Sequence, residues 1–362
     1  MRRRQQPSVG VVCAHNPGRR NLGMYSVDLS AARYFAGRGL PHRLLTYSGP
    51  RRAGELRYRP IAGPNAYAPY PEIVFWGDFQ QNPVWGVRNH AIRLMRRRGM
   101  SSQDALEAWK RRFLLDGVPL AAGQRVYSIG TCFLGARTAL AQAGLEEAQY
   151  RDLLSRFTAI APRDDASFRE LSELGLSNLL HGFDCASLLD LPRAEPRSTG
   201  RLAYAFGRTF RPWVGTEIAN TVAEALALQP VPVDWLLPKY RLKGRARAYR
   251  EALDVLRGVD FLVTDIYHLT INALNVGCPV SCIGRVETSL ADTCDDQKKL
   301  VLAEMLGLGE QYIGLPADAA DPAAVAAEAV IQRRRAPVVP EDGLRERART
   351  FREALDRLWE GR

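Results

Sequence analysis

The chain has 362 residues, of which 46% are hydrophobic, 25% charged and 9% aromatic, the composition of a folded globular protein. Its length favours two domains, since one domain usually holds about 100–200 residues. The composition excludes disorder, collagen-like repeats and coiled coil as the main state. No apolar run approaches the ~18–20 residues of a membrane-spanning helix, and no signal-peptide pattern follows the basic start. We therefore expect a cytoplasmic protein.

The charge is strongly positive, with 50 Lys and Arg residues against 39 Asp and Glu, a net +11. Such an excess attracts phosphates or carboxylates, whether on small ligands or on nucleic acid. The basic runs at 96–98, 111–112 and 333–335 are scattered along the sequence, and no compact basic and aromatic nucleic-acid motif is present. We interpret these runs as solvated surface and expect no specific nucleic-acid partner.

Six cysteines stand at 13, 132, 185, 278, 282 and 294, mostly in apolar contexts. A disulfide framework is not expected in a long chain without an export signal. Cys278 and Cys282 are spaced C-x3-C, but no second pair or nearby His doublet completes a four-ligand metal site. The cysteines are predicted to lie in the core, and no metal site is predicted.

In the first half, short apolar runs alternate with amphipathic segments. Strands are predicted at 8–14, 43–47, 72–76, 124–129 and 157–161, and helices at 24–38, 91–98, 102–115, 147–157 and 166–174. The stretch that follows the strand at 43–47, up to residue 70, is rich in Pro and is predicted to consist of turns. This alternation predicts α/β layers with parallel strands, forming an N-terminal domain over 1–190.

The Pro- and Arg-rich segment 191–200 is the predicted linker. A second α/β domain is predicted over 201–340. Its strands are expected at 201–206, 231–236, 259–264 and 279–283, and its helices at 216–228, 245–257 and 267–276. An amphipathic helix within 341–362 is predicted to pack back across the domains. The fold class is therefore α/β, with two Rossmann-like domains facing a cleft.

Four predicted strand ends carry polar or Gly-rich sequence, which is where open parallel sheets bind ligands. The turn at 16–23 could cradle an anion or be a plain turn. Asp78 could act as a base or bind sugar hydroxyls, or serve as a turn residue. Arg163 could bind an anion or pair with Asp164. His268, in the first turn of a helix, suits proton transfer but could also be structural, and Asp265 is a natural N-cap.

The segment 264–280 (TDIYHLTINALNVGCPV) resembles the hallmark of the polysaccharide pyruvyl transferase family, Asp-Arg-Leu-His, an Ala-Leu helix and Gly-x-Pro-Val. Further pieces follow in the family's order. These are 21–23 (Asn-x-Gly), 76–78 (Trp-Gly-Asp), 163–167 (Arg-Asp-x-x-Ser), 184–186 and 296–299. The resemblance covers about residues 10–315.

The resemblance implies a glycosyltransferase-B-like pair of domains that transfers a pyruvyl group from phosphoenolpyruvate to a sugar hydroxyl, with phosphoenolpyruvate as co-substrate and no cofactor. That chemistry needs cations for the donor's phosphate and carboxylate, an acid for the enol methylene and a base for the acceptor hydroxyl. By this resemblance His268 is the general acid/base and Asp78 contacts the acceptor, together with Asn21, Gly23 and Gly77.

The family's Arg-Leu-His triplet reads Ile266-Tyr267-His268 here, so other cations must bind the donor. The candidate donor-binding residues are Arg163, Arg208, Arg211, Lys239 and Arg285. Two alternatives remain open: a glycosyltransferase that uses a nucleotide sugar, and a non-catalytic binding protein with the same fold. The acceptor, the pathway and homo-oligomerisation are left open by the sequence.

Overall fold

The computed structural model describes residues 8–13, 21–47, 52–61, 63–195, 198–236, 244–286, 294–316, 318–334 and 342–360. Their contacts divide the chain into two compact units. Unit 1 contains the described residues before position 14, Val27–Cys185 and the chain from Phe351 onward. Unit 2 contains the described residues from 21 to Ser26 and Ala186–Thr350. The segment predicted as a linker, where described, thus lies in unit 2.

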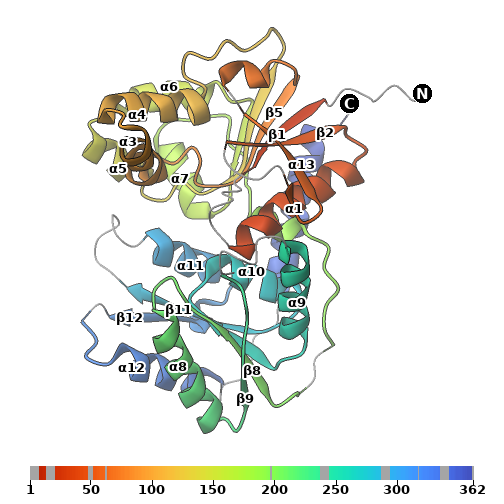
Figure 1. Ribbon diagram of the computed structural model, residues 1–362, viewed down its shortest axis with the longest axis vertical. Helices are drawn as coiled ribbons and strands as arrows, with labels where there is room; N and C mark the ends of the chain where they lie inside the picture. Colours follow the sequence, from red (N-terminus) through yellow and green to blue (C-terminus); the bar gives the residue numbers. More distant parts are fainter. Residues whose placement is uncertain are drawn as a thin grey trace. The chain divides into compact units, whose positions relative to one another are not determined.

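Unit 1 is built on a seven-stranded sheet (Figure 1). Its strands are β1 (Val9–Cys13), β2 (His42–Thr46), β3 (Arg52–Ala53), β4 (Leu56–Pro60), β5 (Glu72–Asp78), β6 (Arg125–Thr131) and β7 (Ala159–Pro162). The order is β3-β4-β2-β1-β5-β6-β7, and every pair is parallel except β3 with β4. β1 is buried along its whole length and β6 along nearly all of its length, and their apolar residues made them visible in the sequence, whereas β4 alternates buried and exposed residues.

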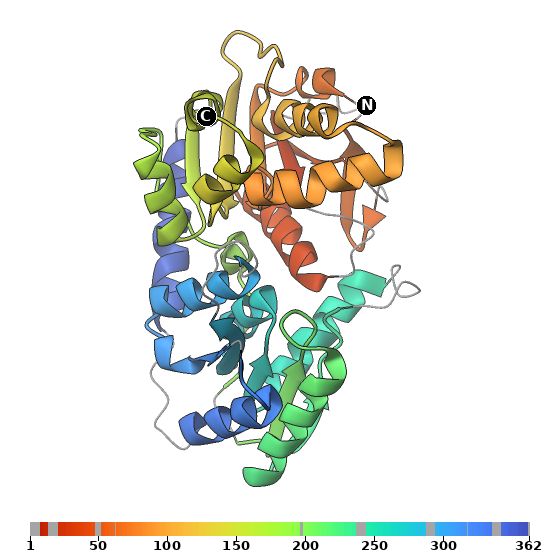
Figure 2. The same cartoon turned by 90° about the vertical axis from the view of Figure 1, so that its left-hand side faces the viewer.

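The helices of unit 1 flank this sheet. They are α1 (Leu22–Gly37, from Val27 onward), α2 (Pro83–Trp85), α3 (Ile92–Arg98), α4 (Ser102–Trp109), α5 (Ala136–Ala143), α6 (Glu147–Ser155) and α7 (Asp165–Glu173), with the short helix η1 (Pro64–Tyr67). The short helix η4 (Cys185–Leu188) begins at the last residue of this part of unit 1 and continues in unit 2. Two π-helical turns, η2 (Gly86–Ala91) and η3 (Lys110–Leu114), continue α2 and α4. Figure 2 shows the α2–η2–α3 helix (orange) beside α4 and η3. Phe75, Val126 and Ile160 from the strands form the core with Trp109 and Leu140 from the helices.

Unit 2 is built on a five-stranded parallel sheet, ordered β12-β11-β10-β8-β9. Its strands are β8 (Arg201–Ala205), β9 (Gln229–Pro232), β10 (Phe261–Thr264), β11 (Val280–Val286) and β12 (Tyr312–Pro316). Its helices are α8 (Pro212–Ala225), α9 (Arg245–Arg257), α10 (Tyr267–Asn275), α11 (Cys294–Met305) and α12 (Pro322–Arg334), with the short η6 (Gly309–Gln311). Figure 1 shows α8 and α12 on one face of the sheet and α10 and α11 on the other.

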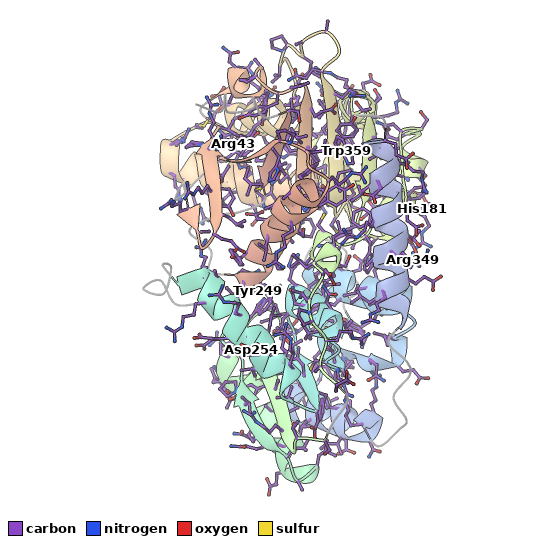
Figure 3. All side chains as sticks on the ribbon, turned by 90° about the vertical axis from the view of Figure 1, so that its right-hand side faces the viewer. Arg43, His181, Tyr249, Asp254, Arg349 and Trp359 are labelled. Atoms are coloured by element: carbon purple, nitrogen blue, oxygen red, sulfur yellow. The ribbon has the colours of Figure 1, made fainter. Side chains whose placement is uncertain are left out.

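The last helix, α13 (Asp342–Leu358), contributes to unit 1 from Phe351 onward. There Trp359, labelled in Figure 3, packs edge-on against Phe35 with ring centroids 5.6 Å apart, and lies 4.8 Å from the Tyr127 ring. Asp356 accepts a hydrogen bond from the Tyr34 hydroxyl at 2.8 Å and forms an ion pair with Arg38 at 2.6 Å. The end of the chain is therefore part of the first unit's structure.

Several sequence predictions are confirmed and others are corrected. Cys13, Cys132, Cys185, Cys278 and Cys282 are buried free thiols, as predicted; the Cys294 side chain lies outside the described residues. The stretch predicted as turns before residue 70 contains the β3–β4 pair. The strand predicted at 231–236 is instead the short β9, because Pro230 and Pro232 confine it to the sheet edge. Within the described residues, no helix has the length and apolar character needed to span a membrane.

Candidate active site

The carboxyl ends of three adjacent strands in unit 2 bring together most of the predicted donor-side residues. β10 lies between β8 and β11 in the sheet. The loop after β8 carries Arg208 and Arg211, β10 leads into His268, and Arg285 stands near the end of β11. All three arginine side chains are exposed, whereas His268 is 9% exposed. Lys239 lies outside the described residues.

Asp265 holds the loop after β8 in place. Its carboxylate accepts backbone N–H groups of Gly207 (3.0 Å), Arg208 (2.9 Å), Thr209 (2.7 Å) and Phe210 (2.8 Å). The prediction that Asp265 caps α10 was wrong, since Ile266 is the N-cap residue and no side chain caps this helix. The carboxylate instead accepts hydrogen bonds from four backbone N–H groups of the loop after β8, and not from the first N–H groups of α10.

Burial raises the pKa of Asp265, while the loop N–H groups and the ammonium of Lys299 act in the opposite direction. Lys299 is fully buried and donates to the Thr209 hydroxyl (2.8 Å) and to the main-chain oxygens of Asp265 (3.1 Å) and Ile283 (2.9 Å). It also forms an ion pair with Asp296. The ammonium thus ties together the segments that follow β8, β10 and β11.

Asp296 completes this network. Its carboxylate accepts from the Thr209 hydroxyl at 2.5 Å and from the Arg285 backbone N–H at 3.1 Å. The sequence analysis noted 296–299 only as a landmark of the family and missed its role. The spacing of Asp296 and Lys299 by three residues, which places both on one helix face, was the available signal.

His268 packs directly against the start of α1. A Cβ added to Gly23 would lie 2.4 Å from the His268 Cβ, a separation that real Cβ atoms do not show. The Gly23 N–H donates to the Asn21 side-chain oxygen at 2.9 Å. The structure therefore brings Asn21, Gly23 and His268 together in unit 2, and only glycine permits this close approach.

A buried amide fixes the helix that carries His268. Asn272 donates to the His268 carbonyl oxygen at 2.7 Å and to the Ser26 hydroxyl at 3.1 Å. Its own oxygen accepts from the Tyr249 hydroxyl at 2.6 Å. Tyr249, labelled on α9 in Figure 3, also packs edge-on against Tyr25 at 5.5 Å. These contacts join α1, α9 and α10 around His268.

The other predicted residues lie in unit 1, at the ends of β5 and β7. Gly77 has φ +71°, and a Cβ there would lie 2.3 Å from Val27 Cγ1, so its glycine identity follows from backbone conformation and packing. Asp78 ends β5 opposite Thr131, and its side chain lies outside the described part of the structure.

Arg163 is 1% exposed. Its Nε lies 3.6 Å from an Asp164 carboxylate oxygen, and its guanidinium stacks 5.2 Å from the centre of the Phe79 ring. Asp164 in turn caps α7 by accepting the Ser167 N–H at 2.7 Å. This burial favours the structural interpretation of Arg163 over direct contact with a donor.

Comparison with solved structures gives the class of fold. The chain is similar to a protein designated a UDP-N-acetylglucosamine 2-epimerase from Listeria monocytogenes (TM-score 0.51, 10% identity, 97% of this chain and 95% of that one covered). It is also similar to Phytolacca americana UGT2 complexed with UDP-2-fluoro-glucose and pterostilbene (TM-score 0.47, 11% identity, 97% and 94% covered). Two α/β units with parallel strands and the likeness to the epimerase structure define a glycosyltransferase-B-like fold, as predicted.

Comparison with curated protein sequences gives no match. The profile of the polysaccharide pyruvyl transferase family matches residues 99–285, just over half of the chain. The chain belongs to the polysaccharide pyruvyl transferase family. It is accordingly a transferase of the polysaccharide-modifying kind, with a donor and an acceptor as substrates.

Proposed function

We propose that the protein transfers a pyruvyl group from phosphoenolpyruvate to hydroxyl groups of a sugar, using His268 as general acid/base. The observation that carries the proposal is the arrangement of the unit 2 sheet: His268 follows the central strand β10, and exposed arginines follow the strands on both sides. A proton-transfer group flanked by cations suits a donor with a phosphate and a carboxylate.

The loop after β8 supports binding of the donor's anionic groups. Arg208 and Arg211 precede α8, a helix of 14 residues that begins at Pro212. The positive end of the helix dipole and two guanidinium groups favour an anion at this position. The network of Asp265, Lys299 and Asp296 holds the loop before any ligand arrives, which lowers the entropy cost of binding. In this proposal Arg208, Arg211 and Arg285 replace the arginine that the family places where Ile266 stands.

The proposed transfer has two steps. A proton is added to the methylene carbon of phosphoenolpyruvate while the oxygen of an acceptor hydroxyl bonds to C2 and releases its own proton to a base. The oxygen of a second acceptor hydroxyl then loses its proton, bonds to C2 and displaces the phosphate, which closes a cyclic ketal. His268 donates or accepts a proton in these steps, Asp78 contacts the acceptor, and the arginines stabilise the departing phosphate.

The proposal is tested by ligand-dependent thermal stabilisation and by phosphate release. Phosphoenolpyruvate should raise the melting temperature of the wild type more than UDP-, GDP- or CMP-sugars do, because a ligand that binds only the folded state stabilises it by mass action. His268→Gln should keep this shift and lose phosphate release in the presence of acceptor. A shift with a nucleotide sugar alone would instead indicate a glycosyltransferase, and no shift with any of them would exclude the proposed donor.

Among the arginines, Arg208→Met, Arg211→Met and Arg285→Met should each weaken phosphoenolpyruvate binding by roughly 10–150-fold if the residue contacts the donor, the range expected for a charge-assisted hydrogen bond. Arg250→Met, an exposed residue on α9, serves as the matched control. If none of the three changes affinity, these arginines do not replace the missing one.

A further inference from the structure

Unit 1 contains a cavity of about 450 Å³. It adjoins the carboxyl ends of two neighbouring parallel strands, since Tyr47 follows β2, Ile61 follows β4, and both residues line it. Other lining residues come from α4 and the π-helical turn η3: Asp104, Glu107, Arg111 and Arg112. Both its size and its position at strand ends are typical of sites for small ligands.

The aromatic side of the cavity is held rigidly. The hydroxyls of Tyr47 and Tyr67 both donate to the main-chain oxygen of Arg112, at 2.6 and 3.2 Å. The Tyr47 ring also packs against Phe113 with centroids 4.7 Å apart. Because the phenol groups are already bonded to the protein, both rings are fixed; Tyr67 is 2% exposed, so the half-buried Tyr47 offers a ligand more ring surface than Tyr67 does.

The cationic side of the cavity is formed by Arg111 and Arg112. The Arg112 guanidinium is half-buried and lies 4.7 Å from the centre of the Tyr47 ring. Burial lowers the pKa of Arg112, and the positive charge of Arg98 lowers it further. In the part of the chain that the structure describes, neither Arg111 nor Arg112 has an ion pair with a carboxylate. An anion bound here would relieve both the burial cost and the repulsion.

The two acidic residues of the cavity are already partnered on their own helix. Glu107 forms an ion pair with Lys110 at 2.7 Å, and Asp104 accepts the Ser101 hydroxyl at 2.7 Å. The neutral Ser101 hydroxyl leaves the charge of Asp104 in place, so the two arginines exceed the acidic charge that has no cationic partner by one. Both carboxylates retain oxygens that can accept hydrogen bonds from hydroxyl groups.

The arginines belong to two basic runs that the sequence analysis interpreted as scattered solvated surface. The structure corrects this for Arg112, which is half-buried, whereas Arg98 and Arg111 are exposed as interpreted. The π-helical turn that carries Arg111 and Arg112 widens the helix locally, and such turns are frequent at functional sites.

From these observations we propose that the cavity binds a sugar carrying an anionic group, either a phosphate or a carboxylate. The sugar ring would lie beside Tyr47, the anionic group on Arg112 and Arg111, and the ring hydroxyls near Asp104 and Glu107. This binding does not depend on the proposed pyruvyl transfer.

The test is isothermal titration of the full-length protein with glucose 6-phosphate, glucuronate, glucose and inorganic phosphate. Glucose 6-phosphate or glucuronate should bind at least about tenfold more tightly than glucose or inorganic phosphate, because only the former engage both sides of the cavity. Arg112→Met and the exposed Arg111→Met should each weaken that binding about tenfold or more. Arg97→Met, an exposed residue on α3 outside the cavity, should leave it unchanged.

Each outcome decides the proposal. Binding of the phosphate but not the carboxylate, or the reverse, supports it and identifies the anionic group. Equal affinity for glucose, equal affinity for inorganic phosphate, or binding insensitive to both arginine variants would overturn it. Arginine-sensitive binding without phosphate release from phosphoenolpyruvate would contradict only the proposed function. Pyruvyl transfer to a neutral sugar, with no binding of either charged sugar, would contradict only this inference.

Discussion

At the scale of single residues, the contact between Gly23 and His268 gives the most direct link from sequence to function. The resemblance to the family named both residues, but a sequence shows only that they are far apart along the chain. The structure explains the glycine: the backbone of α1 approaches His268 so closely that a methyl group has no room.

We therefore expect Gly23→Ala to displace the start of α1 or the His268 side chain. Overpacking of this kind costs roughly 1–3 kcal/mol of folding free energy, and phosphate release from phosphoenolpyruvate should fall with it. Gly37→Ala is the matched control, since it ends the same helix with no atom within 4 Å of the added Cβ. Urea denaturation and the activity assay should separate the two variants. Equal behaviour would mean that the close approach is unimportant.

His90 is the residue for which the structure predicts a pH dependence. It is buried in unit 1, stacked on Trp85 at 5.1 Å and edge-on to Phe113 at 5.1 Å. Burial, with the charges of Arg112, Arg93 and Arg98, lowers the pKa of His90 from 6.5 to about 3. Between these two pH values the unfolded chain binds a proton that the folded chain does not, so stability decreases as the pH falls through this window.

At pH 5 this difference corresponds to about 2 kcal/mol relative to neutral pH. His90→Phe keeps an aromatic ring in the stack and has no proton to bind, so it should lose this part of the pH dependence. Urea denaturation of both proteins at pH 5.0 and 7.5 measures the effect. A variant that loses as much stability as the wild type on acidification would show that His90 is not responsible.

At the scale of elements, the sequence predicted the central strands of both sheets because strands buried on both faces are rich in apolar residues. It missed the β3–β4 pair, whose Pro, Gly and Arg residues are typical of turns, and also the edge strand β12 and the helix α12. It missed the Ala-rich α5 as well, and gave no indication that α2 and α4 continue as π-helical turns.

The candidate site could likewise be predicted from the sequence only in part. His268 and the arginines could be named because they follow recognisable strands. The roles of Asp265 and Lys299 depend on which loops are neighbours across the sheet. The sequence of a single element does not indicate the order of the strands in the sheet. The partial burial of Arg112 beside the unit 1 cavity was missed for the same reason.

The contacts of Lys299 with Thr209, Asp296 and the main chain after β10 and in β11 lead to a testable prediction about how elements are held together. Lys299→Met would leave Asp296 without its cation and break the bonds that join three strand ends. Removal of one partner from a buried ion pair costs about 3–5 kcal/mol, and the loop that carries Arg208 should become more mobile. Weaker phosphoenolpyruvate binding should accompany the loss of stability.

The double variant Asp296→Asn with Lys299→Met separates charge from packing. The asparagine oxygen can still accept the Arg285 N–H, and its amide group can donate to the Thr209 hydroxyl, which no longer accepts from Lys299. The carboxylate of Asp296 that lost its cation is gone, so part of the stability should return. Thermal unfolding of the wild type, single and double variants checks this. A double variant less stable than the single one would argue against an uncompensated charge as the cause.

At the scale of the whole molecule, neither unit is a continuous stretch of chain. The start of α1 belongs to unit 2 while the remainder of that helix belongs to unit 1, and the end of α13 returns to unit 1. A composition change such as the Pro-rich segment at 191–200 marks a loop, but it does not show which unit a distant helix joins. Sequence periodicity predicted α13 correctly as an amphipathic helix, but only the structure shows which residues it packs against.

This arrangement makes the stability of the N-terminal sheet depend on the last residues of the chain. Trp359 is 2% exposed and packs against Phe35 of α1 and Tyr127 of β6. Trp359→Ala should therefore destabilise unit 1 by about 3–5 kcal/mol, the usual cost of removing a large buried aromatic side chain. Trp213→Ala is the matched control, because that indole is 65% exposed and its removal should change stability by less than about 1 kcal/mol. Hydrogen exchange locates the effect: amides of β1, β5 and β6 should exchange faster in Trp359→Ala, and those of β8 and β10 should not, whereas uniform acceleration in both sheets would mean that the two units unfold as one.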